Sequence, residues 1–263
     1  MDLGLRGRTA LVFGGSKGLG RAVADALAGE GTTVALVARG REALDEAAGT
    51  MRERYGVAVH TFAADVADHA AVLAAVADAE RALGGRIDIL VNNTGGPPPT
   101  DPIGVEPSLW AAQFHAMVSS VIAVTDAVVP GMRARRWGRV LTIASTTVIE
   151  PNPALMLSNA LRSALVGWSK TLADAVAGDG VTVNLLLPGR IATDRTDFLD
   201  ATAATAQGVT ADVVRAAKSA GIPLGRYGTP AEFGAVAAFL ASDPASYVTG
   251  TMMRIDGGMV RSV

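Results

Sequence analysis

The stretch Phe13-Gly14-Gly15-Ser16-Lys17-Gly18-Leu19-Gly20 decides the fold, because it joins the apolar run Thr9–Phe13 to the amphipathic run Leu19–Leu27. The first run is typical of a buried strand and the second of a helix with one apolar face. Three glycines in Gly-x-x-x-Gly-x-Gly spacing permit a tight turn and a close approach of the backbone to a ligand. The free N–H groups that begin the helix would then bind a pyrophosphate. A tight turn without a ligand is the alternative interpretation.

The same alternation of short apolar runs and longer amphipathic runs continues along the chain. Further strands are expected at Thr33–Val37, Val57–Phe62, Ile87–Val91, Arg139–Ile143, Val181–Leu187 and Met252–Ile255. Helices are expected at Glu42–Arg54, Ala70–Leu83, Ser108–Arg133, Ala154–Ala177 and Pro230–Leu240. Repeated alternation predicts an α/β fold, a doubly wound parallel sheet of the Rossmann type with helices on both faces. We expect residues 1–263 to form a single domain, since no linker or repeat interrupts the pattern.

Two long stretches, Gly95–Pro107 and Pro188–Thr229, show no such pattern and are expected to be irregular. Both follow the carboxyl end of an expected strand, where ligands bind in open α/β sheets. Residues 188–229 are therefore the expected substrate loop or lid. Between the two stretches, Ser108 is expected to cap the long helix and Pro130 to end or kink it.

Composition excludes several classes of protein. Apolar residues make up 49% and the net charge is −2, with no basic block of the kind that binds nucleic acid or an anionic membrane. The chain has no cysteine, and His60, His69 and His115 lack metal-ligand spacing, so no metal site is expected. No uninterrupted apolar run reaches about 18 residues, the length of a spanning helix. We expect a cytoplasmic protein whose partner is a small-molecule substrate.

The end of the second strand bears on which nucleotide would bind. The strand ends in Arg39, where an acidic residue would hold a ribose 2′-hydroxyl and an arginine accommodates a 2′-phosphate. Lys17 in the glycine turn could face the same phosphate. These two cations favour NADP(H) over NAD(H), and two solvated loop charges are the alternative.

Taken together, these residues resemble the short-chain dehydrogenase/reductase superfamily, in the branch similar to 3-oxoacyl-carrier-protein reductases. The likeness covers nearly the whole chain, from the glycine turn through Asn92-Asn93-Thr94-Gly95 and Pro188–Thr193 to Asp256-Gly257-Gly258. It implies the cofactor NADP(H) and a homodimer or homotetramer. The residues that it assigns to cofactor binding are Gly14, Ser16, Lys17, Gly18, Leu19, Gly20, Arg39, Asp65, Val66, Asn92, Thr94, Gly95, Arg162, Pro188, Gly189, Ile191 and Thr193.

The resemblance breaks at the catalytic residues. The family uses an asparagine, a serine, a tyrosine and a lysine, and only the serine is kept, as Ser145. Ser158 stands where the tyrosine is expected, Arg162 where the lysine is expected, and Met117 where the asparagine is expected. The runs Asn92–Pro99 and Ser158–Arg162 are similar to a branch of the superfamily described as reductase-like without the full tetrad.

This loss changes the acid–base chemistry, because an aliphatic hydroxyl is a much weaker acid than a phenol. We expect an NADP(H)-dependent oxidoreductase acting on a carbonyl or alcohol with an atypical site. Ser145 would orient the substrate oxygen, Arg162 would hold the nicotinamide ribose, and Ser158, water or the substrate would supply the proton. The alternatives are a non-redox cyclase, dehydratase or isomerase, and a non-catalytic NADP(H)-binding subunit.

Four further residues are weaker candidates for the site. Glu150 lies on the loop between Ser145 and Ser158, and a solvated carboxylate is its simpler interpretation. His115 lies two residues from Met117 and is expected to point to another side of the helix. Asp194 and Arg195 follow the Pro188–Thr193 segment, where Arg195 could bind a substrate carboxylate or phosphate.

Overall fold

The computed structural model describes residues 1–262 and contains one parallel sheet in that range. Its seven strands lie in the order β3-β2-β1-β4-β5-β6-β7. They are β1 (Thr9–Phe13), β2 (Thr33–Ala38), β3 (Val59–Ala63), β4 (Ile89–Asn92), β5 (Gly138–Ile143), β6 (Val181–Pro188) and β7 (Met252–Ile255). The direction of winding reverses between β1 and β4, which opens a crevice at their carboxyl ends. The predicted doubly wound sheet is confirmed.

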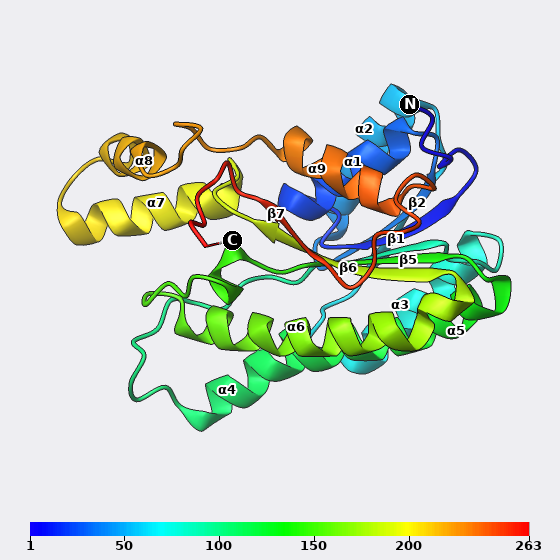
Figure 1. Ribbon diagram of the computed structural model, residues 1–263, viewed down its shortest axis with the longest axis horizontal. Coiled ribbons are helices and arrows are strands. Elements are labelled where there is room, and N and C mark those ends of the chain that lie inside the picture. The colour runs from blue at the N-terminus through cyan, green and yellow to red at the C-terminus, as the bar shows by residue number, and fades with distance from the viewer. Residues whose placement is uncertain (263) are drawn as a thin grey trace.

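Helices cover both faces of the sheet (Figure 1). One layer consists of α1 (Gly18–Gly29), α2 (Arg41–Tyr55) and α9 (Pro230–Ala241). The opposite layer consists of α3 (His69–Ala82), α4 (Pro107–Phe114), α5 (Ser120–Arg135) and α6 (Met156–Val176). Because strands buried on both faces need apolar side chains throughout, β1 and β5 are buried at every residue.

The long helix predicted from Ser108 is a composite. α4 is joined to α5 by a π-helical turn over His115–Ser119. Glu106 rather than Ser108 precedes the first turn, with Pro107 at a position where its missing N–H costs nothing. Pro130 lies inside α5 instead of ending it, and the helix continues to Arg135 with Met132 buried.

The whole stretch Pro107–Arg135 is long and apolar enough to cross a membrane, by length and composition alone. In the fold, however, its second half packs against α3 and its π-helical turn against α6. Of its most apolar window, 44% is buried inside the protein.

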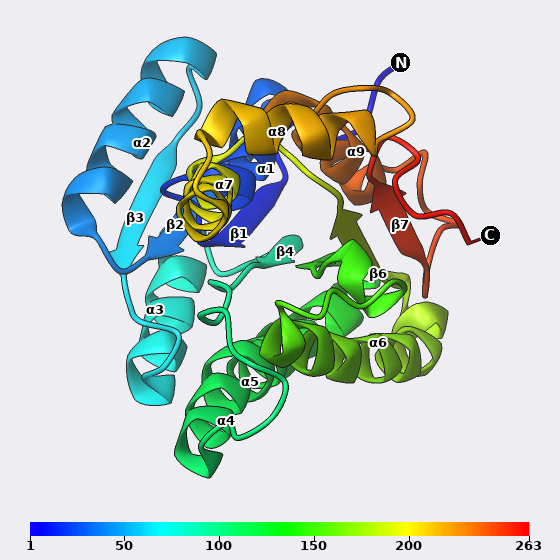
Figure 2. The ribbon, with the colours of Figure 1, turned by 90° about the vertical axis from the view of Figure 1, so that its left-hand side faces the viewer.

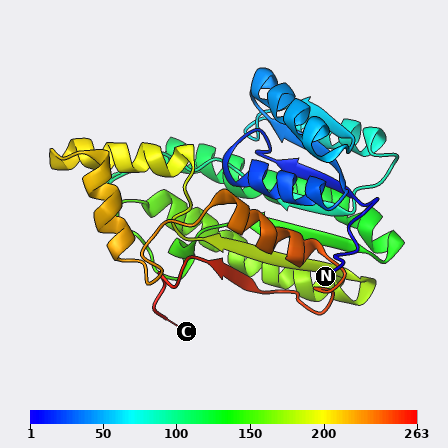
Figure 3. The same ribbon diagram turned by 90° about the horizontal axis from the view of Figure 1, so that it is seen from above.

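The segment predicted to be irregular, residues 188–229, contains two helices, α7 (Asp194–Gln207) and α8 (Ala211–Ala220). They project beyond the carboxyl ends of the strands, as Figures 2 and 3 show. In α7 the buried residues are Asp200 and Ala204, so the helix has no apolar stripe to reveal it in the sequence. The segment lies at the carboxyl edge, where its role as a lid stays a prediction. The expectation that it would be irregular was wrong, because it contains α7 and α8.

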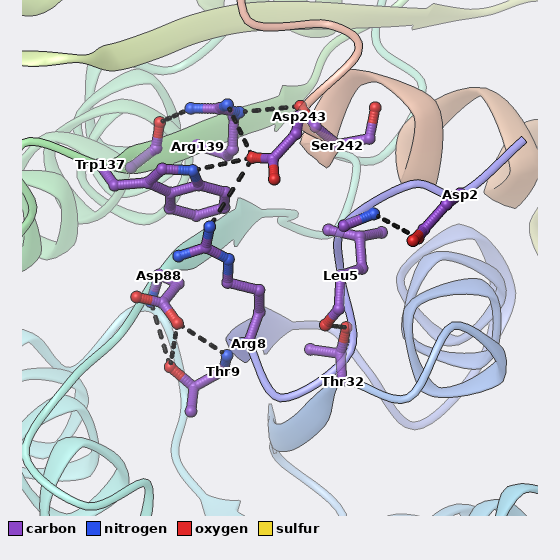
Figure 4. A network of polar contacts seen from close by, with 12 residues as sticks. Asp2, Leu5, Arg8, Thr9, Thr32, Asp88, Trp137, Arg139, Ser242 and Asp243 are labelled. Carbon is purple, nitrogen blue, oxygen red and sulfur yellow. Dashed lines mark hydrogen bonds and ion pairs between the residues drawn. The ribbon is translucent and has the colours of Figure 1, made fainter.

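Polar contacts close the opposite, amino-terminal edge of the sheet (Figure 4). The Asp88 carboxylate, which is buried, accepts hydrogen bonds from the backbone N–H of Thr9 at 3.0 Å and from Arg86 Nε at 3.0 Å. Asp243, after α9, accepts from Trp137 Nε1 at 3.0 Å and lies 3.8 Å from Arg139 Nη2. This edge is tied together, whereas the carboxyl edge is left open for a site.

Candidate active site

The glycine turn packs directly against the segment after β4. Gly14 has a φ of +61°, and a Cβ placed on it would lie 2.4 Å from Asn93 Nδ2. A Cβ on Gly20 would lie 2.3 Å from the Gly14 carbonyl oxygen. Both contacts are shorter than real side chains allow, so these positions require glycine. The turn and the β4 segment therefore meet at the crevice between β1 and β4.

Space for a ligand remains on the outer side of this turn. Gly18 has a φ of +59°, and a Cβ placed on it would meet no heavy atom within 4 Å. The first turn of α1 has no side-chain cap, so its N–H groups point outward without a partner from the cap residue Lys17. A cavity of about 240 Å³ adjoins the turn and is lined by Gly18, Arg21, Ala22, Asp25, Ala192, Thr193, Asp194 and Pro230. Open space beside uncapped N–H groups fits a pyrophosphate.

The two predicted phosphate-binding cations are both free to reach solvent. Arg39, at the end of β2, has a side chain that is 79% exposed, and its Nη1 lies 4.0 Å from Asp65 Oδ2. Lys17 is exposed in the glycine turn. Asp65 also accepts a hydrogen bond from the backbone of Ala67 at 3.0 Å, which orders the segment after β3. Val66, another predicted cofactor-binding residue, lines a small cavity beside Phe13.

The side chain of Asn92 has a structural role. Its buried Nδ2 donates to Thr125 Oγ1 at 3.0 Å and to Thr142 Oγ1 at 3.3 Å, which ties β4 to α5 and β5. The side-chain nitrogen of Asn92 is therefore occupied within the protein, and a cofactor contact through Asn92 stays a prediction. Thr94 and Gly95 follow it at the open edge, where their predicted cofactor contacts stay a prediction.

The predicted segment Pro188–Thr193 leaves β6 under close constraint. A Cβ on Gly189 would lie 2.7 Å from the Cα of Asp256, so only glycine lets these two backbones approach. The backbone of Ala192 donates to Gly228 O at 2.9 Å, and Gly228 N donates to Arg190 O at 2.9 Å. Ile191 is buried here, and Thr193 begins α7. Both stems of the 188–229 segment are thus held side by side.

Ser145 lies just beyond the carboxyl end of β5 and begins a short 3₁₀ turn over Thr146–Val148. Its Oγ accepts hydrogen bonds from Thr147 N at 3.2 Å and from Thr147 Oγ1 at 3.0 Å. With its oxygen occupied by two donors, the hydroxyl hydrogen of Ser145 is directed elsewhere and can be donated to a ligand.

Ser158 and Arg162 are four residues apart on α6, and both are buried. Arg162 Nε donates to Ser158 Oγ at 3.3 Å, and Arg162 Nη1 donates to the carbonyl oxygen of Ile143 at 2.8 Å. Since Ile143 ends β5 two residues before Ser145, these bonds hold the guanidinium beside Ser158 and at the end of the strand that leads to Ser145. The structure therefore joins two of the predicted catalytic residues, Ser158 and Arg162, by a hydrogen bond.

Arg162 is a buried cation without a counter-ion. It is 8% exposed, and in the described range no carboxylate forms an ion pair with it. Burial, and then the positive charge of Arg195, lower the pKa of Arg162 from 12.5 to about 10. The guanidinium consequently remains charged at neutral pH.

Arg195 lies in the first turn of α7, and its Nη2 donates to the carbonyl oxygen of Pro97 at 3.0 Å. It thereby links the 188–229 segment to the loop after β4. Partial burial lowers its pKa also. Neither Pro97 nor Thr147 could be identified as a site residue beforehand, because each acts through a hydrogen bond that is visible only in the folded chain.

Met117, which was predicted to stand in place of the asparagine, has apolar surroundings. It lies in the π-helical turn and packs in a buried cluster with Leu157 and Leu161 of α6. A π-helical turn within an α-helix is rare and is found frequently at functional sites. Here it presents an apolar wall beside the residues of α6.

Two further ionisable candidates, Glu150 and His115, have partners other than Ser145, Ser158 and Arg162. Glu150 Oε1 accepts a hydrogen bond from the backbone N–H of Arg261 at 2.8 Å, so it orders the C-terminal segment. The ring of His115 stacks on His69 of α3, with 3.9 Å between the ring centroids. Within residues 1–262, Arg162 is the ionisable side chain that contacts Ser158. Asp194 lines the cavity beside the glycine turn.

Comparison with known proteins agrees with this architecture. Residues 14–260 match the family described as enoyl-(acyl carrier protein) reductase. The 3-oxoacyl-[acyl-carrier-protein] reductase FabG of Escherichia coli is 34% identical over 257 residues, which are 98% of this chain and 99% of the relative. The FabG protein of Aquifex aeolicus is 31% identical over 261 residues, 98% of this chain and 100% of the relative.

Two solved structures extend the comparison. L-sorbose reductase from Gluconobacter frateurii, in complex with NADPH and L-sorbose, has a TM-score of 0.94 and 32% identity, with 100% of both chains covered. YwfH, an NADPH-dependent reductase involved in bacilysin biosynthesis, has a TM-score of 0.92 and 28% identity, over 97% of this chain and 99% of that one. The chain therefore belongs to the enoyl-(acyl carrier protein) reductase family, in the FabG-like branch of the short-chain dehydrogenase/reductase superfamily of oxidoreductases.

Proposed function

We propose that the protein is a cytoplasmic, NADP(H)-dependent oxidoreductase that interconverts a carbonyl and an alcohol through an atypical site. The observation that carries this proposal is the hydrogen-bonded pair of Ser158 and Arg162, which is tied to the end of β5, the strand that leads to Ser145. It lies on the same edge as the glycine turn of a dinucleotide-binding fold. The NADPH and L-sorbose in the Gluconobacter frateurii reductase support the same assignment.

The residues at the crevice fit the dinucleotide. The N–H groups at the start of α1 would bind its pyrophosphate, and Arg39 and Lys17 would bind the 2′-phosphate. The segment Pro188–Thr193 would lie beside the nicotinamide, and Arg162 beside its ribose. When bound, the nicotinamide supplies the hydride.

Ser145 and Ser158 orient the substrate carbonyl. Each hydroxyl oxygen accepts a hydrogen bond from a neighbour, Thr147 for Ser145 and Arg162 for Ser158, so each hydroxyl hydrogen is free for the substrate oxygen. As that oxygen gains negative charge, the adjacent guanidinium stabilises it in surroundings from which water is largely excluded.

Ser158 then donates the proton. The carbonyl carbon gains the hydride, the carbonyl oxygen gains the hydroxyl proton of Ser158, and water returns a proton to Ser158. Arg162 assists because its hydrogen bond and charge stabilise the serine oxygen while it is deprotonated. A positive charge beside a hydroxyl thus replaces the intrinsic acidity of a phenol.

The contacts of Ser158 favour reduction over a dehydratase or isomerase reaction. Dehydration or isomerisation beside a carbonyl takes a proton from carbon and needs a base at the site. Throughout the described part of the chain, neither a carboxylate nor an imidazole contacts Ser158 or Arg162. The charged guanidinium is not a base at neutral pH.

The test is oxidation of NADPH, followed by its absorbance, against a panel of ketones and oxo acids with identification of the products. We expect Ser158→Ala to lower kcat by about 10²- to 10⁴-fold, the usual contribution of a positioned proton donor. Ser163→Ala is the matched control, since Ser163 is an exposed serine on the same helix.

Three outcomes would contradict the proposal. Substrate turnover without a change in nicotinamide redox state would identify a non-redox enzyme. NADPH binding without turnover of any carbonyl would identify a non-catalytic subunit. Equal activity of Ser158→Ala and Ser163→Ala would remove Ser158 from the reaction.

A further inference from the structure

The segment that follows β7, residues 256–262, forms a strap at the carboxyl edge of the sheet. Its first turn is held by the Asp256 carboxylate, whose Oδ1 accepts from Gly258 N at 2.9 Å and whose Oδ2 accepts from Val260 N at 3.0 Å. The side chain of Val260 is buried, so an apolar contact anchors the strap as well. The strap is therefore an ordered part of this edge.

On one side, the strap packs against the end of the 188–229 segment, just after α8. The carbonyl oxygen of Gly257 accepts from Leu224 N at 3.3 Å. A Cβ on Gly257 would lie 2.9 Å from Ile222 Cγ2, and one on Gly258 would lie 3.1 Å from Pro223 Cγ. Because the two backbones approach this closely, movement of the segment requires movement of the strap.

On the other side, the strap is tied to the turn that begins at Ser145. Glu150 Oε1 accepts from the backbone N–H of Arg261 at 2.8 Å. The backbone N–H of Glu150 donates to Thr146 O at 3.1 Å, and Thr146 Oγ1 donates to Pro188 O at 3.3 Å. Glu150 thus connects the strap to the turn through a short run of hydrogen-bonded residues.

The contacts of the Glu150 carboxylate are those of a tether. Among residues 1–262, no hydrogen bond joins it to Ser145 or Ser158, whose partners are Thr147 and Arg162. Its bond to Arg261 joins residues 111 positions apart in the chain, so it is a product of the fold and not of local structure. A carboxylate that accepts from a backbone N–H also forms a stronger hydrogen bond than a neutral acceptor.

We propose that Glu150 is a positioning residue, which fastens the strap to the Ser145 turn and thereby holds the 188–229 segment closed over the substrate. The strap is then the wall of the substrate site beside β6 and β7. This inference rests on the proposed carbonyl reduction, whose substrate the closed segment would cover. Without the tether, the strap and the segment open together, and the substrate binds only to the closed fraction of the molecules.

Hydrogen exchange of the protein without substrate tests the coupling. Glu150→Ala should speed exchange about threefold to tenfold in peptides that cover residues 256–262 and also in those that cover residues 221–225, because one exposed hydrogen bond is lost. Glu150→Gln should stay close to the unaltered protein, since its side-chain oxygen still accepts from Arg261 N. Unchanged exchange at residues 221–225 in Glu150→Ala would overturn the proposal.

A second pair of variants removes the donor instead of the acceptor. Arg261→Pro lacks the N–H that Glu150 accepts, whereas Arg261→Ala keeps it. We expect Arg261→Pro to speed exchange at residues 221–225 as Glu150→Ala does, and the double variant to add little further. Equal effects of Arg261→Pro and Arg261→Ala would show that the side chain, and not the tether, holds the strap.

Kinetics with ethyl 3-oxobutanoate, a small 3-oxo ester, separate positioning from catalysis. Glu150→Ala should raise KM about threefold to tenfold and change kcat by less than about twofold, while Glu150→Gln restores KM. A fall in kcat of the same size in Glu150→Gln and Glu150→Ala would identify the carboxylate as a proton carrier and overturn the positioning role. If neither this ester nor another carbonyl is reduced, the proposed function fails, and hydrogen exchange still decides whether Glu150 couples the strap to the segment.

Discussion

Arg162 keeps its charge throughout the neutral pH range, because burial and Arg195 lower the pKa of its guanidinium only to about 10. A lysine at this position has a reference pKa of about 10.4, which the same surroundings would lower further. The two side chains therefore differ in the pH at which the site loses its cation.

This difference predicts a pH profile. Carbonyl reduction should be constant from about pH 7 to 9 and should fall as the pH rises through about 10, where Arg162 becomes neutral. In Arg162→Lys, the fall should occur at lower pH. Steady-state kcat measured across this range in both proteins tests the prediction. An identical fall in both would show that another group controls the profile.

A second prediction at this scale concerns the choice of nucleotide. Arg39→Ala should raise the Kd of NADPH about tenfold to a hundredfold, since a charged hydrogen bond to the 2′-phosphate is lost. The Kd of NADH should stay within about twofold. Both constants are measured by titrating the protein with nucleotide and following either quenching of its intrinsic fluorescence or energy transfer from the protein to the bound nucleotide. Arg41→Ala, an exposed arginine at the start of α2, is the control, and an equal loss in that variant would contradict a specific role for Arg39.

At the scale of elements, the last helix begins with a reciprocal cap. Thr229 Oγ1 accepts from Glu232 N at 3.2 Å, and Glu232 Oε2 accepts from Thr229 N at 2.7 Å. Arg226 donates two further hydrogen bonds to the same carboxylate. Arg226, with the cap, lowers the pKa of Glu232 from 4.5 to about 2.

Because the pKa of Glu232 is lower in the folded state, its stabilising contribution is present above about pH 4.5 and is lost as the pH falls towards 2. Glu232→Gln can keep the cap but not the charge. We therefore expect it to lower the midpoint of urea unfolding at pH 7, and to change it less at pH 3. Glu53→Gln, an exposed glutamate of α2, is the control. A pH-independent effect of Glu232→Gln would show that the charge contributes nothing.

Elements whose cause is local could be predicted from the sequence, and those held by distant contacts could not. The β1 to α1 turn follows from its glycines, and the strands follow from continuous apolar runs. α7 escaped prediction because it buries only Asp200 and Ala204 and so lacks an apolar stripe. Pro130 was expected to end or kink its helix. The helix does not end there but continues to Arg135.

The candidate site shows the same division between features that could be predicted and features that could not. The positions of Ser145, Ser158 and Arg162 came from the resemblance to the family, and the structure joins Ser158 to Arg162 by a hydrogen bond. The partners that determine their chemistry, Thr147 and Ile143, came only from the fold. Likewise, the sequence alone did not show that Glu150 accepts a hydrogen bond from Arg261 or that His115 stacks on His69.

At the scale of the molecule, the two edges of the sheet have separate roles, stability at the amino edge and ligand binding at the carboxyl edge. Asp88→Ala should destabilise the fold by about 3 kcal/mol, because it leaves the buried N–H of Thr9 and the neighbouring arginines without their acceptor. The kcat of the folded variant should be unchanged.

Urea unfolding and steady-state kinetics on the same preparation test this separation. Asp78→Ala removes a carboxylate from an exposed ion pair with Arg81 and should cost less than about 0.5 kcal/mol. A loss of kcat in Asp88→Ala under conditions where it is folded would show that the two edges are coupled.

The homodimer or homotetramer implied by the resemblance stays a prediction. α4 and α6 carry the partly buried Trp110 and Trp168 beside an apolar cluster, which a second copy could cover. Light scattering coupled to gel filtration would measure the mass against the 26.8 kDa of one chain. A monomer at micromolar concentration would contradict the prediction.

The paired stems at Ile191 and Gly228 have a consequence for engineering. Because the backbone leaves and rejoins the body at one place, residues 192–227 form an exchangeable cassette between two fixed anchors. Transplanting the corresponding piece of another reductase between those anchors should alter the range of compounds accepted while leaving the sheet intact, since loop closure depends only weakly on insert length.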